Sequence, residues 1–547
     1  MNLLSKQLSD LILVGVSLAQ KDGALPSFES PDHIHLTRPK RREWGDYSSA
    51  LPLQLAKHIG QSPLDIANQI KNYMPQSTML ADSTVSEPGF LNMTLSSDWL
   101  CDQAESVVRK GLSFADLALH SNQRAQVEFV SANPTGPLTV GHGRGGVIGD
   151  TLSNLLSAVG YQVTREFYYN NAGQQMRKLG ESLKIRYLQC LGVSAKLSEE
   201  HYQGEYLTSL GMQLVEKYSD SLAEEDWETF KNFAEEEIAA QHHHTLGRLN
   251  VVMDVLYNEQ SLYEDGSLDG VIDKLRQKKL AYDKDGAVWF AVTELGGLDD
   301  RVIVKSTGEP TYRLPDIAYH CNKMERKFDL VVDVLGADHK DSFPDVLLGV
   351  KAMGYEADKI KLLMHQFVNI KGERMSKRSG NFIGLDELVD EVGADVVRFF
   401  MLMRASESHL EFDMDLAREQ SDKNPVYYVQ YAHARICSIL EKASLAGFSL
   451  EDVKVDGLTH PSERILMRNL LELSDTIDRA VRDLAPHYLT TYARDLASSF
   501  HTFYGECKVI DIDNLTLTLA RINLIRAVRV GLARALDLLG VSAPESM

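Results

Sequence analysis

The residues best suited to chemistry in this chain lie in one glycine-rich segment, 127–146, which reads Val-Glu-Phe-Val-Ser-Ala-Asn-Pro-Thr-Gly-Pro-Leu-Thr-Val-Gly-His-Gly-Arg-Gly-Gly. Residues 127–131 alternate as a buried strand, a Pro/Gly-rich loop follows, and residues 147–158 have helical spacing. Glycines bring backbone N–H groups close to a ligand, and a helix N-terminus adds partial positive charge. With His142 as a further donor, these groups predict a phosphate-binding site, and a nucleotide is the first candidate ligand.

A second polar segment, 372–381, reads Gly-Glu-Arg-Met-Ser-Lys-Arg-Ser-Gly-Asn and presents three cations and two hydroxyl groups between glycines. A loop of this composition can close over a polyphosphate. We therefore expect it to contact the same nucleotide as the first segment.

The two segments together resemble the paired signatures of class I aminoacyl-tRNA synthetases. Residues 139–142 stand where that family has His-Ile-Gly-His, and residues 374–378 stand where it has Lys-Met-Ser-Lys-Ser. Further stretches, and both ends of the chain, are similar to arginyl-tRNA synthetases of the bacterial type: 128–133, 311–320, 336–339 and 424–432. The resemblance implies an enzyme of translation that forms arginyl-adenylate from ATP and arginine, releases pyrophosphate, and transfers arginyl to the 3′-terminal adenosine of its tRNA. It also implies that tRNA takes part in the activation step.

The chain departs from the family signature at its first position, where Thr139 replaces histidine. Threonine keeps a hydroxyl group but lacks an imidazole. We expect Thr139 to hydrogen-bond a phosphate oxygen or an ordered water, with a modest loss of rate. In the second signature, Arg374 and Arg378 replace lysine and serine, while Lys377 is retained.

Amino-acid activation is an in-line attack of a carboxylate on the α-phosphate of ATP, which needs positioning and charge neutralisation more than a protein nucleophile. His142 and the backbone amides of the glycine loop are expected to bind the triphosphate. Lys377, assisted by Ser376 and Arg374, is expected to neutralise the negative charge on the departing pyrophosphate. Mg2+ is expected to contribute to the same neutralisation. No tightly bound cofactor or protein metal site is expected. The predicted catalytic and ATP-binding residues are Thr139, Gly141, His142, Gly143, Arg374, Met375, Ser376 and Lys377.

Arginine recognition calls for carboxylates, because a guanidinium group presents five N–H donors in a planar fork. Asp316 and Glu128 are the candidates, with Tyr312 one helical turn from Asp316. Two alternatives stay open: Asp316 as a helix cap or solvated acid, and Glu128 as a paired buried acid. The resemblance adds Asn133 and Asp338 to the predicted arginine-binding residues.

Two other functions compete with this interpretation. Gly141, Gly143 and Gly146 also match G-x-G-x-x-G, with Glu166 at the distance of a ribose-binding acid, which suggests a nicotinamide enzyme. In that fingerprint the first glycine follows the strand almost directly, whereas residues 132–140 intervene here, so the spacing favours a different phosphate loop. The second alternative is a tRNA-binding paralogue that no longer charges tRNA, for which Thr139 is the only hint.

The composition agrees with an intracellular globular enzyme of two to four domains, because the chain has 547 residues, 44% of them hydrophobic and 24% charged. Five cysteines, an odd number without C-x-x-C spacing, argue against a disulfide framework or zinc and suit a reducing cytoplasm. The run His242-His243-His244 is expected to be solvated. No apolar run is long enough to span a bilayer.

The net charge of −20 is unusual for a protein that binds tRNA. For RNA binding, however, the electrostatic potential at the binding surface matters more than the net charge of the whole chain. Arginines and aromatic residues interleave along the C-terminal helices, where they can grip phosphates and stack on unpaired bases. The alternative is that these arginines are ordinary surface residues and the aromatics are core. The predicted tRNA contacts are Tyr431, Arg435, Tyr488 and Arg494.

Three parts are expected along the chain, which we predict to be a monomer. Residues 1–115 mix helix and strand signals, and the resemblance implies an α+β accessory domain that touches the tRNA elbow. Residues 116–410 alternate strands and helices, which predicts an α/β catalytic domain with a Rossmann-like, doubly wound parallel sheet. An insertion with acidic helices interrupts it at about 185–300. Residues 411–547 have helical periodicity and predict an all-α anticodon-binding bundle.

Overall fold

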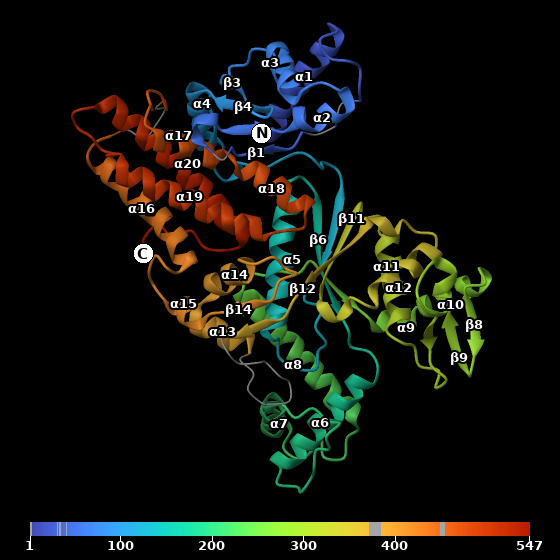
Figure 1. The fold of residues 1–547 in the computed structure, drawn as a ribbon. Helices are drawn as coiled ribbons and strands as arrows, with labels where there is room; N and C mark the ends of the chain where they lie inside the picture. The colour runs from blue at the N-terminus through green and yellow to red at the C-terminus, as the bar shows by residue number, and fades with distance from the viewer. Residues whose placement is uncertain (1–2, 30, 32–33, 40, 371–383, 449–453) are drawn as a thin grey trace. The chain divides into compact units, whose positions relative to one another are not determined.

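The computed structural model describes residues 3–547 except 30, 32–33, 40, 371–383 and 449–453 (Figure 1). The chain forms two compact units, one of residues 119–419 with 484–487, the other of residues 1–118, 420–483 and 488–547. Each is described separately below. No helix among the described residues is both long and apolar enough to cross a membrane.

A five-stranded sheet organises the unit of residues 119–419. Its strands are β5 (Arg124–Glu128), β6 (Gln162–Tyr169), β7 (Val255–Asn258), β11 (Leu330–Gly336) and β12 (Ile360–His365), in the order β12-β11-β5-β6-β7. All neighbouring strands run parallel. The order reverses between β5 and β11, and ligands of doubly wound sheets bind beside the carboxyl ends of the strands at such a point. The predicted α/β fold class is confirmed.

Helices cover the sheet and bury most of its central strands β5 and β11, including the acids Glu128 and Asp333. Helix α5 (Val140–Ala158) packs along β5, β6 and β11, and α14 (Ala394–Leu402) packs against α5. Helices α11 (Arg313–Glu325) and α12 (Phe343–Ala352) share a core with the sheet, in which Ile317, Tyr319 and Val331 are almost completely buried. The strand expected over 127–131 ends at Glu128, because Val130 and Ser131 have φ angles of 69° and 39° that turn the chain out of the sheet.

The insertion consists of two pieces. Helices α6 (Gln174–Cys190), α7 (Glu205–Tyr218) and α8 (Trp227–Arg248) have a core of their own, which includes Leu183, Tyr187 and Phe230. After β7 come α9 (Gln260–Glu264), α10 (Ser267–Gln277) and an antiparallel sheet of β8 (Ala281–Lys284), β9 (Ala287–Phe290) and β10 (Arg301–Val304). Past β12, β13 (Val368–Ile370) pairs in parallel with β14 (Leu410–Phe412), and helices α13 (Leu385–Val392) and α15 (Met414–Arg418) accompany them.

The other unit combines both ends of the chain. Strands β1 (Leu36–Thr37), β2 (Tyr47–Ser49), β3 (Leu80–Ser86) and β4 (Phe90–Leu95) form an antiparallel sheet with helices α1 (Leu4–Lys21), α2 (Leu51–Ile59), α3 (Pro63–Tyr73) and α4 (Ser97–Lys110). The C-terminal bundle contains α16 (Pro425–Leu445), α17 (Pro461–Leu471), α18 (Leu473–Arg482), α19 (His487–Glu506) and α20 (Leu515–Leu539). Helix α4 packs on α17 and α20.

Buried ion pairs fasten the N-terminal sheet to this bundle. Arg464 Nη2 lies 2.5 Å from Asp46 Oδ2, and Arg468 Nη1 lies 3.3 Å from Asp46 Oδ1. Arg521 Nε is likewise 2.7 Å from the buried Glu463. These three arginines therefore have structural partners within the protein.

Candidate nucleotide and arginine site

The first signature lies at the carboxyl end of β5, where α5 begins. Thr139 is the N-cap of α5, and its Oγ1 accepts a hydrogen bond of 3.4 Å from the His142 backbone N–H. The Thr139 backbone N–H in turn donates to His142 Nδ1 at 3.1 Å. In the neutral imidazole, an accepting Nδ1 leaves the proton on Nε2. The cap therefore makes His142 an Nε2–H donor. A direct contact of Thr139 with phosphate stays a prediction.

The two glycines predicted to contact ATP have different surroundings. Among the described residues, a Cβ atom on Gly141 would meet only Thr139 Oγ1, at 3.6 Å, so these residues leave room for a ligand to approach the backbone here. A Cβ atom on Gly143 would lie 2.5 Å from Leu385 Cδ1. Gly143 is therefore required for the close packing of α13 on α5.

The second signature, including Arg374, Met375, Ser376 and Lys377, lies outside the described residues. The segment directly after it is hydrogen-bonded to the first signature. Gly384 forms a bridge with Thr139, and the Leu385 N–H donates to the Leu138 carbonyl oxygen at 3.2 Å. The start of α13 thus lies next to the N-terminus of α5.

Two acids with raised pKa values lie together beside the sheet. Asp316 occupies the first turn of α11, and burial raises its pKa to about 6, with a further contribution from the charge of Glu128. Glu259, directly after β7, is 5% exposed, and burial together with the charge of Asp316 raises its pKa to about 7. Neither acid caps α11, which begins at Arg313. Two carboxyl groups whose charges repel each other are ready to receive a cation.

Glu259 is a candidate that sequence reasoning missed. The available signal was its position directly after a short strand, because residues at the carboxyl ends of parallel strands line the binding crevice. Its pairing with Asp316, 57 positions further along, has no signature in the local sequence.

Glu128 belongs to a buried charge network. Lys323 Nζ lies 2.5 Å from both Glu128 Oε2 and Asp333 Oδ1, and Ser131 Oγ donates to Glu128 Oε1 at 2.8 Å. His320 continues the network, with Nε2 2.9 Å from Asp333 Oδ2 and Nδ1 2.7 Å from the Asp316 carbonyl oxygen. Lys323 and His320 lower the pKa of Asp333 despite its burial, which raises it. Glu128 thus has the contacts of a paired buried acid, and the network supports the helix turn that carries Asp316.

The other residues predicted to bind arginine lie at the surface. Tyr312 directly precedes α11 and is 83% exposed. Asn133 is exposed and donates to Gln175 Oε1 at 2.9 Å. Asp338 is exposed in the short helix after β11, next to His339, whose charge influences the pKa of Asp316.

Comparisons with known proteins agree along the whole chain. Family models match residues 3–95 (Arginyl tRNA synthetase N terminal domain), 105–401 (tRNA synthetases class I (R), catalytic domain) and 429–547 (DALR anticodon binding domain). The Arginine–tRNA ligase of Desulfotalea psychrophila is 44% identical over 518 residues, which cover 93% of this chain and 94% of that protein. The chain belongs to the arginyl-tRNA synthetase family. The Arginine–tRNA ligase of Salinibacter ruber is 42% identical, covering 94% of this chain and 96% of the relative.

Solved structures of arginyl-tRNA synthetases have the same fold. The putative enzyme from Campylobacter jejuni superposes with a TM-score of 0.77 at 30% identity, covering 83% of this chain and 100% of that chain. The Thermus thermophilus arginyl-tRNA synthetase gives a TM-score of 0.79 at 24% identity and covers both chains completely. The resemblance to class I synthetases is confirmed, and the nicotinamide alternative is wrong.

In this arginyl-tRNA synthetase, the predicted tRNA contacts on α16 form a cation–π arrangement. The Arg435 guanidinium lies 4.8 Å from the ring centre of Tyr431 and 5.1 Å from that of Tyr504, and it donates to the Tyr431 hydroxyl at 2.5 Å. All three side chains reach the surface. The arrangement presents aromatic faces next to a fixed positive charge.

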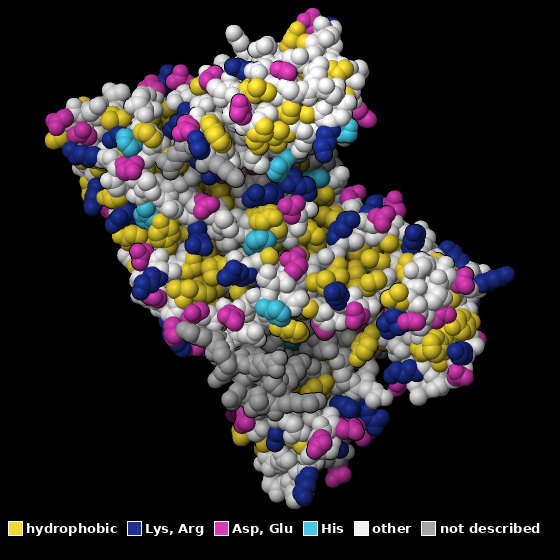
Figure 2. Space-filling model, viewed as in Figure 1, with side chains coloured by type: hydrophobic (Ala, Val, Ile, Leu, Met, Phe, Trp, Pro, Cys, Tyr) yellow, Lys and Arg dark blue, Asp and Glu magenta, His cyan; other side chains and the backbone are white. Residues whose placement is uncertain are grey.

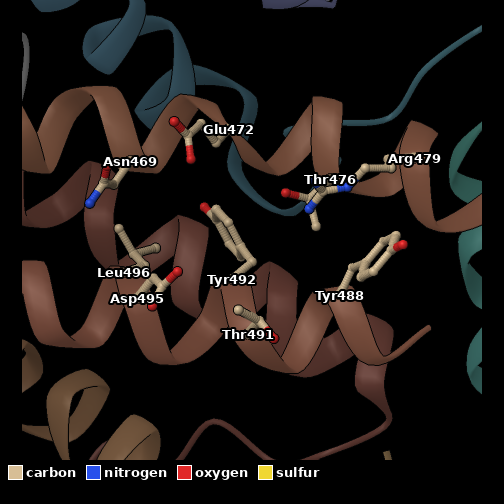
Figure 3. A pocket seen from close by; sticks show the side chains of 9 residues that line it. All are labelled: Asn469, Glu472, Thr476, Arg479, Tyr488, Thr491, Tyr492, Asp495 and Leu496. Atoms are coloured by element: carbon tan, nitrogen blue, oxygen red, sulfur yellow. The ribbon is translucent and has the colours of Figure 1, made fainter. Parts of the chain in front are cut away.

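The other two predicted contacts lie on α19. Tyr488 lines a small pocket between α18 and α19, with the Arg479 guanidinium 4.4 Å from its ring centre (Figure 3). Arg494 is exposed. On the face drawn in Figure 2, basic and acidic side chains are interspersed, in keeping with a net charge of −20.

Proposed function

We propose that the protein is an arginine–tRNA ligase that forms arginyl-adenylate from ATP and arginine and then transfers arginyl to the 3′-terminal adenosine of its tRNA. The observation that carries this proposal is the pair of acids Asp316, in the first turn of α11, and Glu259, directly after β7, because the charge of Asp316 helps to raise the pKa of Glu259. A guanidinium placed between the two carboxylates relieves their repulsion and supplies the donors that both require. Tyr263 supports the pair by donating to Glu259 Oε1 at 3.3 Å.

The reaction needs ATP and arginine side by side. ATP is proposed to bind at the N-terminus of α5, where the backbone near Gly141 is accessible and His142 offers its Nε2–H to a phosphate oxygen. Lys377, with Ser376 and Arg374, is proposed to neutralise the leaving pyrophosphate, and Met375 to contact ATP; these four lie outside the described residues. Mg2+ bound to the triphosphate would add charge neutralisation.

Arginine is proposed to enter with its guanidinium towards Asp316 and Glu259. Asn133, Tyr312 and Asp338 are exposed and available to the rest of the substrate. Glu128 is proposed to act through its negative charge and through the Lys323 network.

For tRNA, we propose the division predicted from the sequence: residues 1–115 touch the elbow, 116–410 carry out catalysis, and 411–547 bind the anticodon. Tyr431 and Arg435 offer a stacking face, and Tyr488 and Arg494 offer further contacts along α19. We further propose that the enzyme works as a monomer in the cytoplasm.

Pyrophosphate exchange into ATP tests the proposal, with each of the twenty amino acids and with and without total tRNA. Exchange with arginine alone is expected, and its dependence on tRNA shows whether the RNA completes the site. No exchange with any amino acid, in a protein that still binds tRNA, would favour the non-charging paralogue.

A further inference from the structure

Helix α8 contacts the loop before the first signature and helix α13, which follows the second signature in the chain. Green in Figure 1, it runs from α6 and α7 towards the sheet. Its residue His242 is 3% exposed, and Nε2 lies 2.8 Å from the Gly136 carbonyl oxygen in the loop before the first signature. The expectation that this histidine is solvated is wrong, although His243 and His244 are exposed as expected. The buried His242 side chain therefore hydrogen-bonds the backbone carbonyl group of Gly136 in this loop.

Further along the same helix, two side chains hold the start of α13, which follows the second signature. Thr245 is 1% exposed, and its Oγ1 donates to Asp386 Oδ2 at 2.7 Å. Arg248 Nη1 lies 2.8 Å from Asp386 Oδ1, and its Nη2 also pairs with Asp390. Both contacts bind α13 to the end of α8.

The spacing of these residues makes α8 a single support for both segments. Residues three apart on an α-helix are neighbours on one side, so His242, Thr245 and Arg248 form one row. His242 hydrogen-bonds the loop before the first signature. Thr245 and Arg248 contact α13, which follows the second signature in the chain. The Leu385–Leu138 hydrogen bond then joins the two held segments to each other.

An ordinary packing role explains this row less well. The loop before α5 has left the sheet, so its carbonyl groups have no strand partner, and the insertion supplies side-chain donors for two of them. Tyr206 of α7 donates to the Thr135 carbonyl oxygen at 2.5 Å, next to the His242 contact at Gly136. An apolar contact would fill the space without fixing the position of the backbone, whereas directional hydrogen bonds to these half-buried carbonyl groups do both.

We propose that α8 sets the relative position of the loop before the first signature and the start of α13, with His242, Thr245 and Arg248 as positioning residues for adenylate formation. The catalytic part of this inference rests on the proposed function. None of the three needs to touch substrate. Each acts by fixing backbone to which the nucleotide-binding groups are attached.

Amide hydrogen exchange in the free protein tests whether α8 holds the two segments in place. This measurement does not require the protein to be active. His242→Leu removes the contact with Gly136, and the nearly isosteric Thr245→Val removes the contact with Asp386 together with a hydrogen bond to the Gln241 carbonyl oxygen within α8. If α8 couples the segments, each variant raises exchange in both 134–143 and 384–392, although its own side chain contacts only one of them. Faster exchange confined to the contacted segment, or no change in either variant, would overturn the proposal.

A matched control uses the same helix. Lys231→Met breaks the Lys231–Glu235 ion pair of 2.8 Å, which contacts neither segment, and exchange in both should stay at the wild-type rate. Faster exchange there in this control would mean general loosening of α8 and would refute a specific role for the row.

Kinetics test the catalytic part. In arginine-dependent pyrophosphate exchange, His242→Leu and Thr245→Val should lower kcat by up to about 100-fold with little change in the KM for arginine. His242→Gln, whose amide N–H can reach the Gly136 carbonyl, should recover most of the loss. An unchanged kcat despite faster hydrogen exchange would refute the catalytic role. A wild-type protein without exchange activity would refute the proposed function, while the hydrogen-exchange result would still decide whether α8 holds the two segments in place.

Discussion

Glu259→Gln should weaken arginine binding and at the same time stabilise the free protein. The side chain is buried, and folding raises its pKa from 4.5 to about 7. The folded state therefore holds a proton that the unfolded chain has released, and stability is lost as the pH rises through this range. At pH 8 the ionised carboxylate costs about 3 kcal/mol of folding free energy. Glutamine removes that cost, so urea denaturation at pH 8 should show an increase of about 2–3 kcal/mol.

Arginine affinity should change in the opposite direction. Loss of one charged acceptor for a buried guanidinium costs about 2–5 kcal/mol, or at least about 30-fold in Kd. Isothermal titration calorimetry with arginine measures this loss, and ATP affinity should stay nearly constant. Asp316→Ala should likewise weaken arginine binding, because Asp316 is the second proposed acceptor for the guanidinium.

The pH dependence gives a second measurement of the same site. Bound guanidinium favours ionised carboxylates, so arginine must expel the protons that Asp316 and Glu259 hold at low pH. With pKa values of about 6 and about 7, the affinity should fall about 20-fold between pH 8 and pH 6. Calorimetry in two buffers of different ionisation enthalpy should detect proton release near pH 6, and Glu259→Gln should reduce it.

The control is Glu264→Gln, an equal charge change at an exposed position of α9. It should leave both stability and arginine affinity within error of the wild type. The reasoning would be refuted if Glu259→Gln bound arginine as tightly as the wild type, or if arginine and ATP affinities fell by equal factors.

Three further predictions concern other parts of the protein. Thr139→Ala removes the cap of α5, so it should lower the free energy of unfolding in urea by about 1 kcal/mol and slow adenylate formation modestly. Thr139→Ser is the conservative control, and an unchanged rate in Thr139→Ala would contradict the role of Thr139. Lys323→Met removes the ammonium group that the buried carboxylates of Glu128 and Asp333 share, and it should lower stability at pH 8 by about 3–5 kcal/mol, a loss that shrinks when acid protonates them; a pH-independent loss would contradict this account. Arg435→Ala should raise the KM for tRNA in aminoacylation while arginine binding stays constant, and a shift in arginine binding would count against a tRNA contact.

The sequence by itself determined the family, the α/β class and the position of both signatures. These features are local, because a glycine loop before an apolar helix and a cationic loop far downstream can be recognised from consecutive residues. The alternation of Val127 and Phe129 also indicated β5, yet the strand ends at Glu128, since positive φ angles at Val130 and Ser131 are not evident from side-chain patterns.

The electrostatic partners were decided only by the tertiary structure. Glu259 meets Asp316 across 57 positions, Lys323 pairs with Glu128 across 195, and His242 reaches Gly136 across 106. A pKa depends on burial and on charges brought close by the packed sheet and helices, and neither quantity is a property of neighbouring residues in the chain. The sequence therefore identified which groups can do the chemistry, whereas packing decided which carboxylates are held in ion pairs, as Glu128 is by Lys323, and which have raised pKa values, as Glu259 has.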